Sequence, residues 1–167
     1  IDNDQRIWMS VYPNGVTVYD KNYPDYKWYR NHIGNNNSIK NDQVNYLIED
    51  SEGDIWYATN NGISIFNPTT NEWKHLLTQD ESDKGEIVLN HTFLSLCEIH
   101  PGTVIAGGYT TGVYRIDKKT LNAQLLTSMT YNPKSNPNFA NKYIRVIFKD
   151  NEGLIWTGGN YYLGCTD

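Results

Sequence analysis

Residues 50–67 read DSEGDIWYATNNGISIFN, and this stretch decides the fold. Residues 55–59, IWYAT, are aromatic and β-favouring, so they predict a strand. Asn61-Gly62 supplies the positive φ angles of a tight turn, and residues 63–66 alternate as a returning strand. Gly53, in the turn before the first strand, can adopt a left-handed conformation. The stretch therefore predicts a β-hairpin preceded by a glycine turn.

The hairpin recurs, imperfectly, three more times along the chain. The copies start near residues 7, 103 and 154, and the matching strand residues are Trp8, Trp56, Ile105 and Trp156, spaced by 48, 49 and 51 residues. A second marker keeps the same period, at Asn41, Asn90 and Asn141. A period of about 40 to 50 residues with four strands per unit is the signature of a β-propeller.

The sequence thus predicts an all-β propeller segment built from four-stranded antiparallel blades, two full and two partial. We expect a partial blade at 1–33, a second blade with its preceding loop at 34–78, a third with its loop at 79–129 and a partial fourth at 130–167. Such a segment does not close a ring of four to eight blades by itself. We therefore expect a fragment of a longer chain, or blades completed by another copy, because an open array exposes apolar surface at both ends.

Chain order within a blade predicts which end of the propeller binds ligands. Blades usually run from the innermost strand outward, so we expect the apolar strands 43–49, 92–99 and 142–149 to be innermost and the Trp-bearing strands to come second. The long loops 34–41, 79–91 and 130–141 then share a face with the Asn60-Asn61-Gly62 turn. Variable loops on a rigid scaffold usually carry recognition, so this is the expected binding face.

Composition, net charge and the length of apolar runs argue against some classes of function. The chain has 13 Gly, 13 Tyr and 5 Trp among 167 residues, as turn-rich β proteins do, and its formal net charge is −5. A mildly acidic chain argues against nucleic-acid binding, which usually needs a basic face. No apolar run approaches 18 residues, so we expect no membrane contact by this segment. Because the sequence opens inside a repeat, it says nothing about a secretory leader before Ile1.

The pattern N41-x-x-V44, continued as E49-D50-x-x-G53-x-I55-W56-x-x-T59-x-x-G62-I63, resembles the two-component-regulator propeller repeat. The resemblance extends over residues 6–160 and is most specific in the second blade and at 150–156. It departs from the family pattern at Ile105, which replaces the Trp, and after Gly159, where a Gly-Leu hairpin is expected.

The resemblance implies a role in ligand sensing. Such repeats build the periplasmic sensor regions of hybrid two-component systems in glycan-degrading gut bacteria, anchored in the inner membrane. It implies further repeats in the same parent chain, a downstream histidine kinase, an oligosaccharide ligand, and a second copy of the ectodomain as a homodimer partner. The chain itself contains none of the signalling chemistry.

Residues that depart from the repeat are the candidate sugar contacts. A sugar ring stacks on an aromatic side chain while its hydroxyls need donors and acceptors. Arg145 replaces Asn45 and Leu94 of the other copies, and its guanidinium could bind a carboxylate or sulfate or be satisfied by neighbouring carbonyls. The candidate ligand-binding residues are Tyr109, Arg145, Tyr161, Tyr162, His91 and Asn90.

Other conspicuous residues are expected to be structural. We expect Trp28 and Trp73 to pack on the outer strands, and the repeat itself is represented by Trp8, Trp56, Trp156, Gly53, Gly62, Gly112 and Gly153. The four histidines fall at unrelated repeat positions, so no metal site and no cofactor are expected. No catalytic motif is present. Two alternatives to ligand sensing stay open: a propeller enzyme acting on polysaccharide, as a lyase or hydrolase, and a protein-interaction scaffold.

Overall fold

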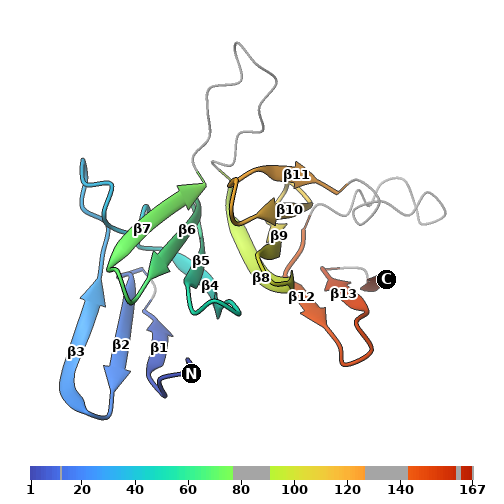
Figure 1. Cartoon of the computed structure of the whole chain (residues 1–167). Coiled ribbons are helices and arrows are strands. Elements are labelled where there is room, and N and C mark those ends of the chain that lie inside the picture. Colours follow the sequence, from blue (N-terminus) through green and yellow to red (C-terminus); the bar gives the residue numbers. More distant parts are fainter. Residues whose placement is uncertain (12, 77–90, 127–142, 161–162, 167) are drawn as a thin grey trace.

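Four antiparallel sheets lie side by side in the computed structural model, which describes residues 1–11, 13–76, 91–126, 143–160 and 163–166 (Figure 1). No helix occurs among these residues. The sheets do not close into a ring, so the predicted open propeller segment is confirmed. We call the sheets blades 1 to 4 in chain order.

The two outer blades have three strands and the two central blades have four. Blade 1 is β1 (Ile7–Ser10), β2 (Val16–Asp20) and β3 (Tyr23–Tyr29), and blade 2 is β4 (Val44–Glu49), β5 (Ile55–Thr59), β6 (Gly62–Asn67) and β7 (Glu72–Leu76). Blade 3 is β8 (Phe93–His100), β9 (Thr103–Gly108), β10 (Val113–Asp117) and β11 (Ala123–Leu125), and blade 4 is β12 (Val146–Lys149), β13 (Ile155–Gly158) and β14 (Leu163–Thr166).

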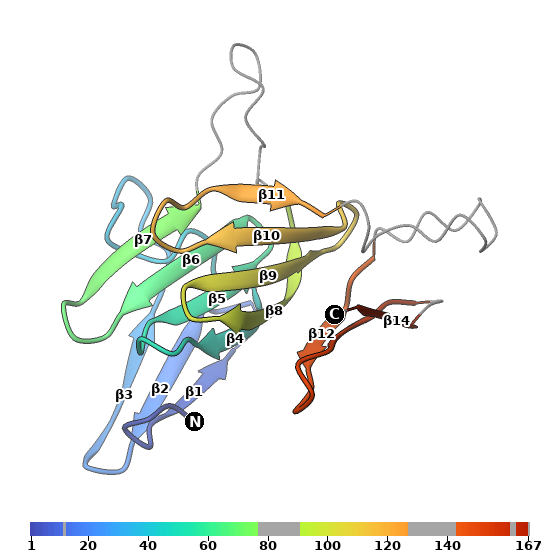
Figure 2. The ribbon, with the colours of Figure 1, turned by 45° about the vertical axis from the view of Figure 1, so that its right-hand side comes forward.

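Successive strands are neighbours within every blade, and the blades meet through their first strands. β8 contacts both β4 and β12, so these strands are innermost and the Trp-bearing strands β5 and β13 come second, as predicted. Figure 2 shows blades 2 and 3 face to face, with blade 4 beyond β8. One expected strand was too long: residues 143–145 of the predicted strand 142–149 precede β12, which starts at Val146.

Aromatic side chains fill the interface between blades 1 and 2. Trp8 of β1 lies 5.5 Å from Tyr29 and 6.1 Å from Phe66, measured between ring centroids, and Trp73 lies 4.8 Å from Phe66. The predicted packing of Trp8, Trp56 and Trp73 is confirmed, whereas Trp156 is half-buried. The same prediction was wrong for Trp28, which is 53% exposed on the face of blade 1 that points away from blade 2.

The turns before the second strands of blades 2 and 4 share one design at what we call the turn end of the propeller. Asp50 accepts hydrogen bonds through Oδ1 from the backbone N–H groups of Glu52 and Asp54, each at 3.0 Å. The position before Asp54 needs a positive φ, which is the reason for Gly53 and its equivalent Gly153, with φ of 85° and 90°. Gly62 and Gly112 lie at the hairpins between the second and third strands, at the opposite end of the blades, and have φ of 83° and 89°.

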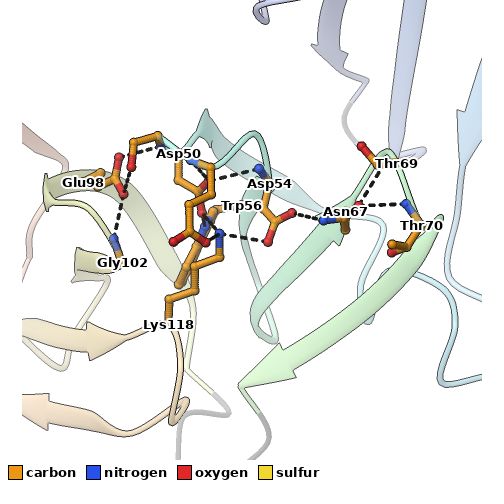
Figure 3. Close-up of polar contacts among 11 residues, drawn as sticks. Asp50, Asp54, Trp56, Asn67, Thr69, Thr70, Glu98, Gly102 and Lys118 are labelled. Carbon is orange, nitrogen blue, oxygen red and sulfur yellow. Dashed lines mark hydrogen bonds and ion pairs between the residues drawn. The ribbon is translucent and has the colours of Figure 1, made fainter.

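A buried ion pair joins blades 2 and 3 at the turn end. Nζ of Lys118, in the turn after β10, lies 2.7 Å from Asp50 and 2.9 Å from Asp54 of blade 2 (Figure 3). Burial alone would lower the pKa of Lys118, but its hydrogen bonds to Asp50, Glu52 and Asp54 outweigh burial and raise it. Lys118 therefore stays charged and holds the two blades in register.

Candidate functional site

The opposite end of the propeller, which we call the loop end, presents a side chain from each innermost strand. In β4 the pairing with β5 shifts between Val44 and Tyr46, which leaves Asn45 out of register; in β8 the same shift leaves out Leu94. A bulge of this kind re-aims a side chain and often occurs next to binding sites. Arg145 takes the equivalent position just before β12, where its backbone N–H donates to Gly158 at 2.9 Å.

Each of these residues has a neighbour in the hairpin between the second and third strands. Nδ2 of Asn45 donates to Oδ1 of Asn60 at 2.8 Å in blade 2. Nε of Arg145 donates to Oδ1 of Asn160 at 2.7 Å in blade 4. Blades 2 and 4 therefore build the same side-chain pair from different donors, and in blade 3 Leu94 and Tyr109 occupy the two positions.

A third position links neighbouring blades at the loop end. Thr92 of blade 3 donates through Oγ1 to the carbonyl of Asn60 in blade 2, at 3.3 Å. Its equivalent in blade 4, Tyr143, packs edge-on against Tyr109 of blade 3, with ring centroids 4.2 Å apart. A side-chain hydrogen bond with Tyr109 raises the pKa of Tyr143. Two aromatic rings thus lie together across a blade boundary.

Glycine permits this close approach of blades 3 and 4. A Cβ atom on Gly107 would lie 2.5 Å from Cγ2 of Ile144, closer than real Cβ contacts allow. The backbone N–H of Ile144 donates to the carbonyl of Gly108 at 3.0 Å. Because Tyr143 and Arg145 flank Ile144, this contact places Tyr143 on Tyr109 and Arg145 next to Tyr143.

The amides of blade 2 are already held in place. Asn45 also donates through Nδ2 to the carbonyl of Phe93 at 2.8 Å, and Nδ2 of Asn60 donates to Oε1 of Gln43 at 2.6 Å. The equivalent residues of blades 2 to 4 form what we call the loop-end strip, namely Gln43, Asn45, Asn60, Thr92, Leu94, Tyr109, Tyr143, Arg145 and Asn160. It combines an aromatic surface with amide, hydroxyl and guanidinium groups, which suits a sugar better than a metal ion.

Two of the six predicted ligand residues are brought together in this strip. Tyr109 is 42% exposed, and Arg145 is exposed next to Tyr143. His91 lies at the same end, where its carbonyl accepts a 3.0 Å hydrogen bond from Gly62, and its side chain is half-buried. The other three, Asn90, Tyr161 and Tyr162, lie outside the described residues.

Sequence reasoning missed Tyr143, Asn160 and the amides Asn45 and Asn60. A signal for one pair was present, because Asn60 and Asn160 occupy the same position of the repeat. The strand bulges and the contact between Tyr109 and Tyr143 have no such signal. They depend on how one blade meets the next.

The turn end contains a polar cleft of about 460 Å³ between blades 1 and 2. It is lined by Asn3, Asp4, Arg6, Glu49, Ser51, Glu52, Gly53, Asn67, Pro68 and Thr69. Pro68 holds the position that Lys118 holds in blade 3, so no lysine fills this space; Arg6 pairs with Asp2 at 2.7 Å instead. Within the described part of the chain, no group of His, Cys, Asp or Glu side chains could hold a metal ion.

The carboxylates of the turn end serve the blade interfaces. Asp50 and Asp54 are committed to Lys118, and Glu98 accepts hydrogen bonds from the backbone N–H groups of Ser51 and Gly102 at 2.7 and 3.0 Å (Figure 3). Catalysis would need an acid and a base converging on one substrate site. These contacts give the carboxylates a structural role.

One family model matches the chain. Residues 38–61 match the model described as the two component regulator propeller, so the resemblance found in the sequence is confirmed for the repeat that builds β4 and β5. No curated protein matches the chain. The described part of the chain has no helix long and apolar enough to cross a membrane.

Solved structures share the fold. The extracellular domain of a protein from B. thetaiotaomicron, described as a hybrid two component system, superposes with a TM-score of 0.77 at 16% identity, over 99% of this chain and 21% of its own. A second such extracellular domain from B. thetaiotaomicron gives 0.70 at 20% identity, over 99% and 19%. PorZ, a surface component of the type-IX secretion system of Porphyromonas gingivalis, gives 0.67 at 14% identity, over 96% and 24%.

These comparisons establish the fold and show how much of each solved structure the chain covers. At such identities the likeness establishes the fold, and the family match identifies residues 38–61, which include β4 and β5, as a two-component-regulator propeller repeat. The chain spans about a fifth to a quarter of the length of these three structures.

Proposed function

We propose that this chain, with its two-component-regulator propeller repeat, is part of the ligand-sensing extracytoplasmic domain of a hybrid two-component regulator. It binds an oligosaccharide at the loop end without catalysis, and the bound state is passed to a histidine kinase on the far side of the inner membrane. The matched repeat and the likeness to extracellular domains of hybrid two component systems support the proposal. Further repeats of the same polypeptide and a second copy of the domain are the protein partners it implies.

The pairing of Tyr109 with Tyr143 beside Arg145 and Asn160 carries the proposal. A pyranose ring has an apolar face that stacks on an aromatic ring, and its equatorial hydroxyls need planar donors and acceptors nearby. The loop-end strip supplies an exposed tyrosine from blade 3 and a hydrogen-bonded guanidinium–amide pair from blade 4. Because Tyr109 belongs to blade 3 and Arg145 and Asn160 belong to blade 4, a bound sugar contacts both blades, and its affinity depends on how the two blades pack.

The test is calorimetric titration of the protein with oligosaccharides released from plant and host polysaccharides. We expect one class to bind, and we expect Tyr109→Ala to weaken that binding by about tenfold to a hundredfold, as loss of a stacking aromatic at a binding site does. Tyr26→Ala is the matched control, because Tyr26 is similarly exposed on β3, in a blade that contributes nothing to the strip.

Two results would count against the proposal. If no oligosaccharide binds, or if Tyr26→Ala weakens binding as much as Tyr109→Ala, the loop-end strip is not the site. Release of a product during the titration would favour the alternative of a propeller enzyme.

A further inference from the structure

Charge is divided unequally between the two ends of the propeller. Most acidic side chains of the described residues lie at the turn end, in the turns 2–6, 49–54, 67–72, 98–103, 117–122 and 149–154. Several of these carboxylates are held by Lys118, Arg6 or backbone N–H groups. The turn end of the described chain is therefore acidic.

The described loop end has the opposite balance. Its charged side chains are Arg30, Lys40, Asp42 and Arg145. Asp42 is already engaged, because its Oδ2 lies 3.5 Å from Arg30 and its Oδ1 accepts a 2.6 Å hydrogen bond from the backbone of Asn31. Within the loop-end strip itself, the described residues carry one formal charge, the guanidinium of Arg145.

The guanidinium group of Arg145 is oriented by an amide side chain. Its Nε donates to Asn160 at 2.7 Å, which fixes the plane of the guanidinium group. No carboxylate pairs with it among the described residues, and the side chain is exposed. A planar guanidinium matches a carboxylate or sulfate with two parallel hydrogen bonds, a geometry that no neutral hydroxyl offers.

We propose that the oligosaccharide bound at the loop-end strip is acidic, and that Arg145 binds its carboxylate or sulfate while a sugar ring rests on Tyr109. The inference rests on the proposed function and adds the charge of the ligand to it. Tyr143 connects the two contacts, because its ring packs on Tyr109 and its hydroxyl interacts electrostatically with Arg145. The described turn end carries most of the acidic side chains, which repel an anionic ligand.

The experiment compares ligands that differ only in charge. The probes are oligogalacturonates with their methyl esters, and sulfated galactan oligosaccharides with their desulfated forms, titrated into the unmodified protein. We expect at least one acidic member to bind about tenfold or more tightly than its neutral counterpart, since a charge-assisted hydrogen bond is about twice as strong as a neutral one. The two pairs distinguish a carboxylate from a sulfate as the preferred group.

Variants identify the residue responsible. Arg145→Gln should remove the preference for the acidic probe, so that the acidic and neutral members of a pair bind alike, and Arg145→Lys should retain part of the preference because lysine keeps the charge but loses the planar, two-pronged donor geometry of the guanidinium. Arg115→Gln is the matched control, an exposed arginine in the middle of β10, outside the strip. Because both arginines are exposed, neither substitution should disturb folding, and a change in affinity reports on the site itself.

The outcomes separate the two proposals. Equal affinity for acidic and neutral members, or a preference that survives Arg145→Gln, overturns the acidic-ligand proposal and leaves oligosaccharide binding intact. Failure of every probe, acidic and neutral, overturns both.

Discussion

Nε1 of Trp56 donates a hydrogen bond of 2.7 Å to Oδ2 of Asp50, six residues earlier in the chain. The same pair joins Trp8 to Asp2 at 2.7 Å and Trp156 to Asp150 at 2.8 Å. A buried indole N–H needs an acceptor, and the aspartate Oδ1 meanwhile accepts from the turn N–H groups. The repeat is therefore defined by an Asp–Trp pair that ties the turn to the second strand.

Replacing Trp56 by Phe should lower the free energy of unfolding by about 2 to 4 kcal/mol. The change removes a donor to a charged and buried acceptor, worth about 1.5 to 3 kcal/mol, and leaves a small cavity. Trp156→Phe is the matched control, because the same pair is half-buried there and the cost should be about half as large. Urea unfolding followed by circular dichroism gives both values, and equal losses would show that burial of the pair does not set its contribution.

Lys118→Met should lower the free energy of unfolding more than the position of Lys118 in a turn suggests. The lysine is mostly buried and faces three carboxylates, so its loss leaves Asp50 and Asp54 without a cation between blades 2 and 3. Breaking a buried ion pair by removing one partner costs about 3 to 5 kcal/mol. Lys119→Met, at the exposed next position, should change stability by no more than about 0.5 kcal/mol. A Lys118→Met protein as stable as the wild type would mean that the two aspartates are protonated or hydrated.

The pairs also fix how stability depends on pH. Burial opposes ionisation of Asp50, but hydrogen bonds from Lys118 and Trp56 outweigh it and keep its pKa below the usual 3.8. At Asp150 the hydrogen bond from Trp156 is the main cause of a lowered pKa. Both aspartates therefore contribute stability that is fully present above about pH 4 and is lost as pH falls through their lowered values.

His75 adds a second loss of stability on acidification, which begins at a higher pH than the loss from the two aspartates. Burial is the largest cause of its lowered pKa, so the stability it contributes is present above 6.5, the usual value, and declines as pH falls below it. Urea midpoints measured between pH 8 and pH 3 should fall in two steps. His75→Phe should remove the step below pH 6.5 and leave the acid step, whereas loss of the acid step in that variant would contradict the assignment.

The repeat period was enough to predict the strand order and the innermost strands, because Asn-Gly turns and recurring Trp residues are local signals. Tyr109 and Arg145 could also be predicted, since each departs from its equivalents in the other blades. Tyr143 was missed because its importance comes from packing on the next blade. Trp28 was assigned to packing by analogy with Trp73, but no neighbouring blade covers that face in the described part of the chain. Lys118 was missed because its partners lie in another blade.

Blade 3 lacks the Asp–Trp pair of the other blades, and the contribution of that pair can be tested by introducing it there. Ile99 and Ile105 replace the Asp and Trp together, and both are buried beside blade 4. Ile105→Trp alone should be destabilising, because the indole overfills the interface and its N–H has no acceptor. Ile99→Asp alone buries a carboxylate without that donor.

The double variant Ile99→Asp with Ile105→Trp should be more stable than the sum of the two single changes predicts. The introduced carboxylate gains the indole N–H and lies near Lys149, whose Nζ already donates to the carbonyl of Ile99. A double-mutant cycle by urea unfolding should give a favourable coupling of about 1 to 3 kcal/mol, the range for residues that contact each other. Additivity within about 0.5 kcal/mol would mean that the Asp–Trp pair owes its strength to the surrounding turn rather than to the two side chains.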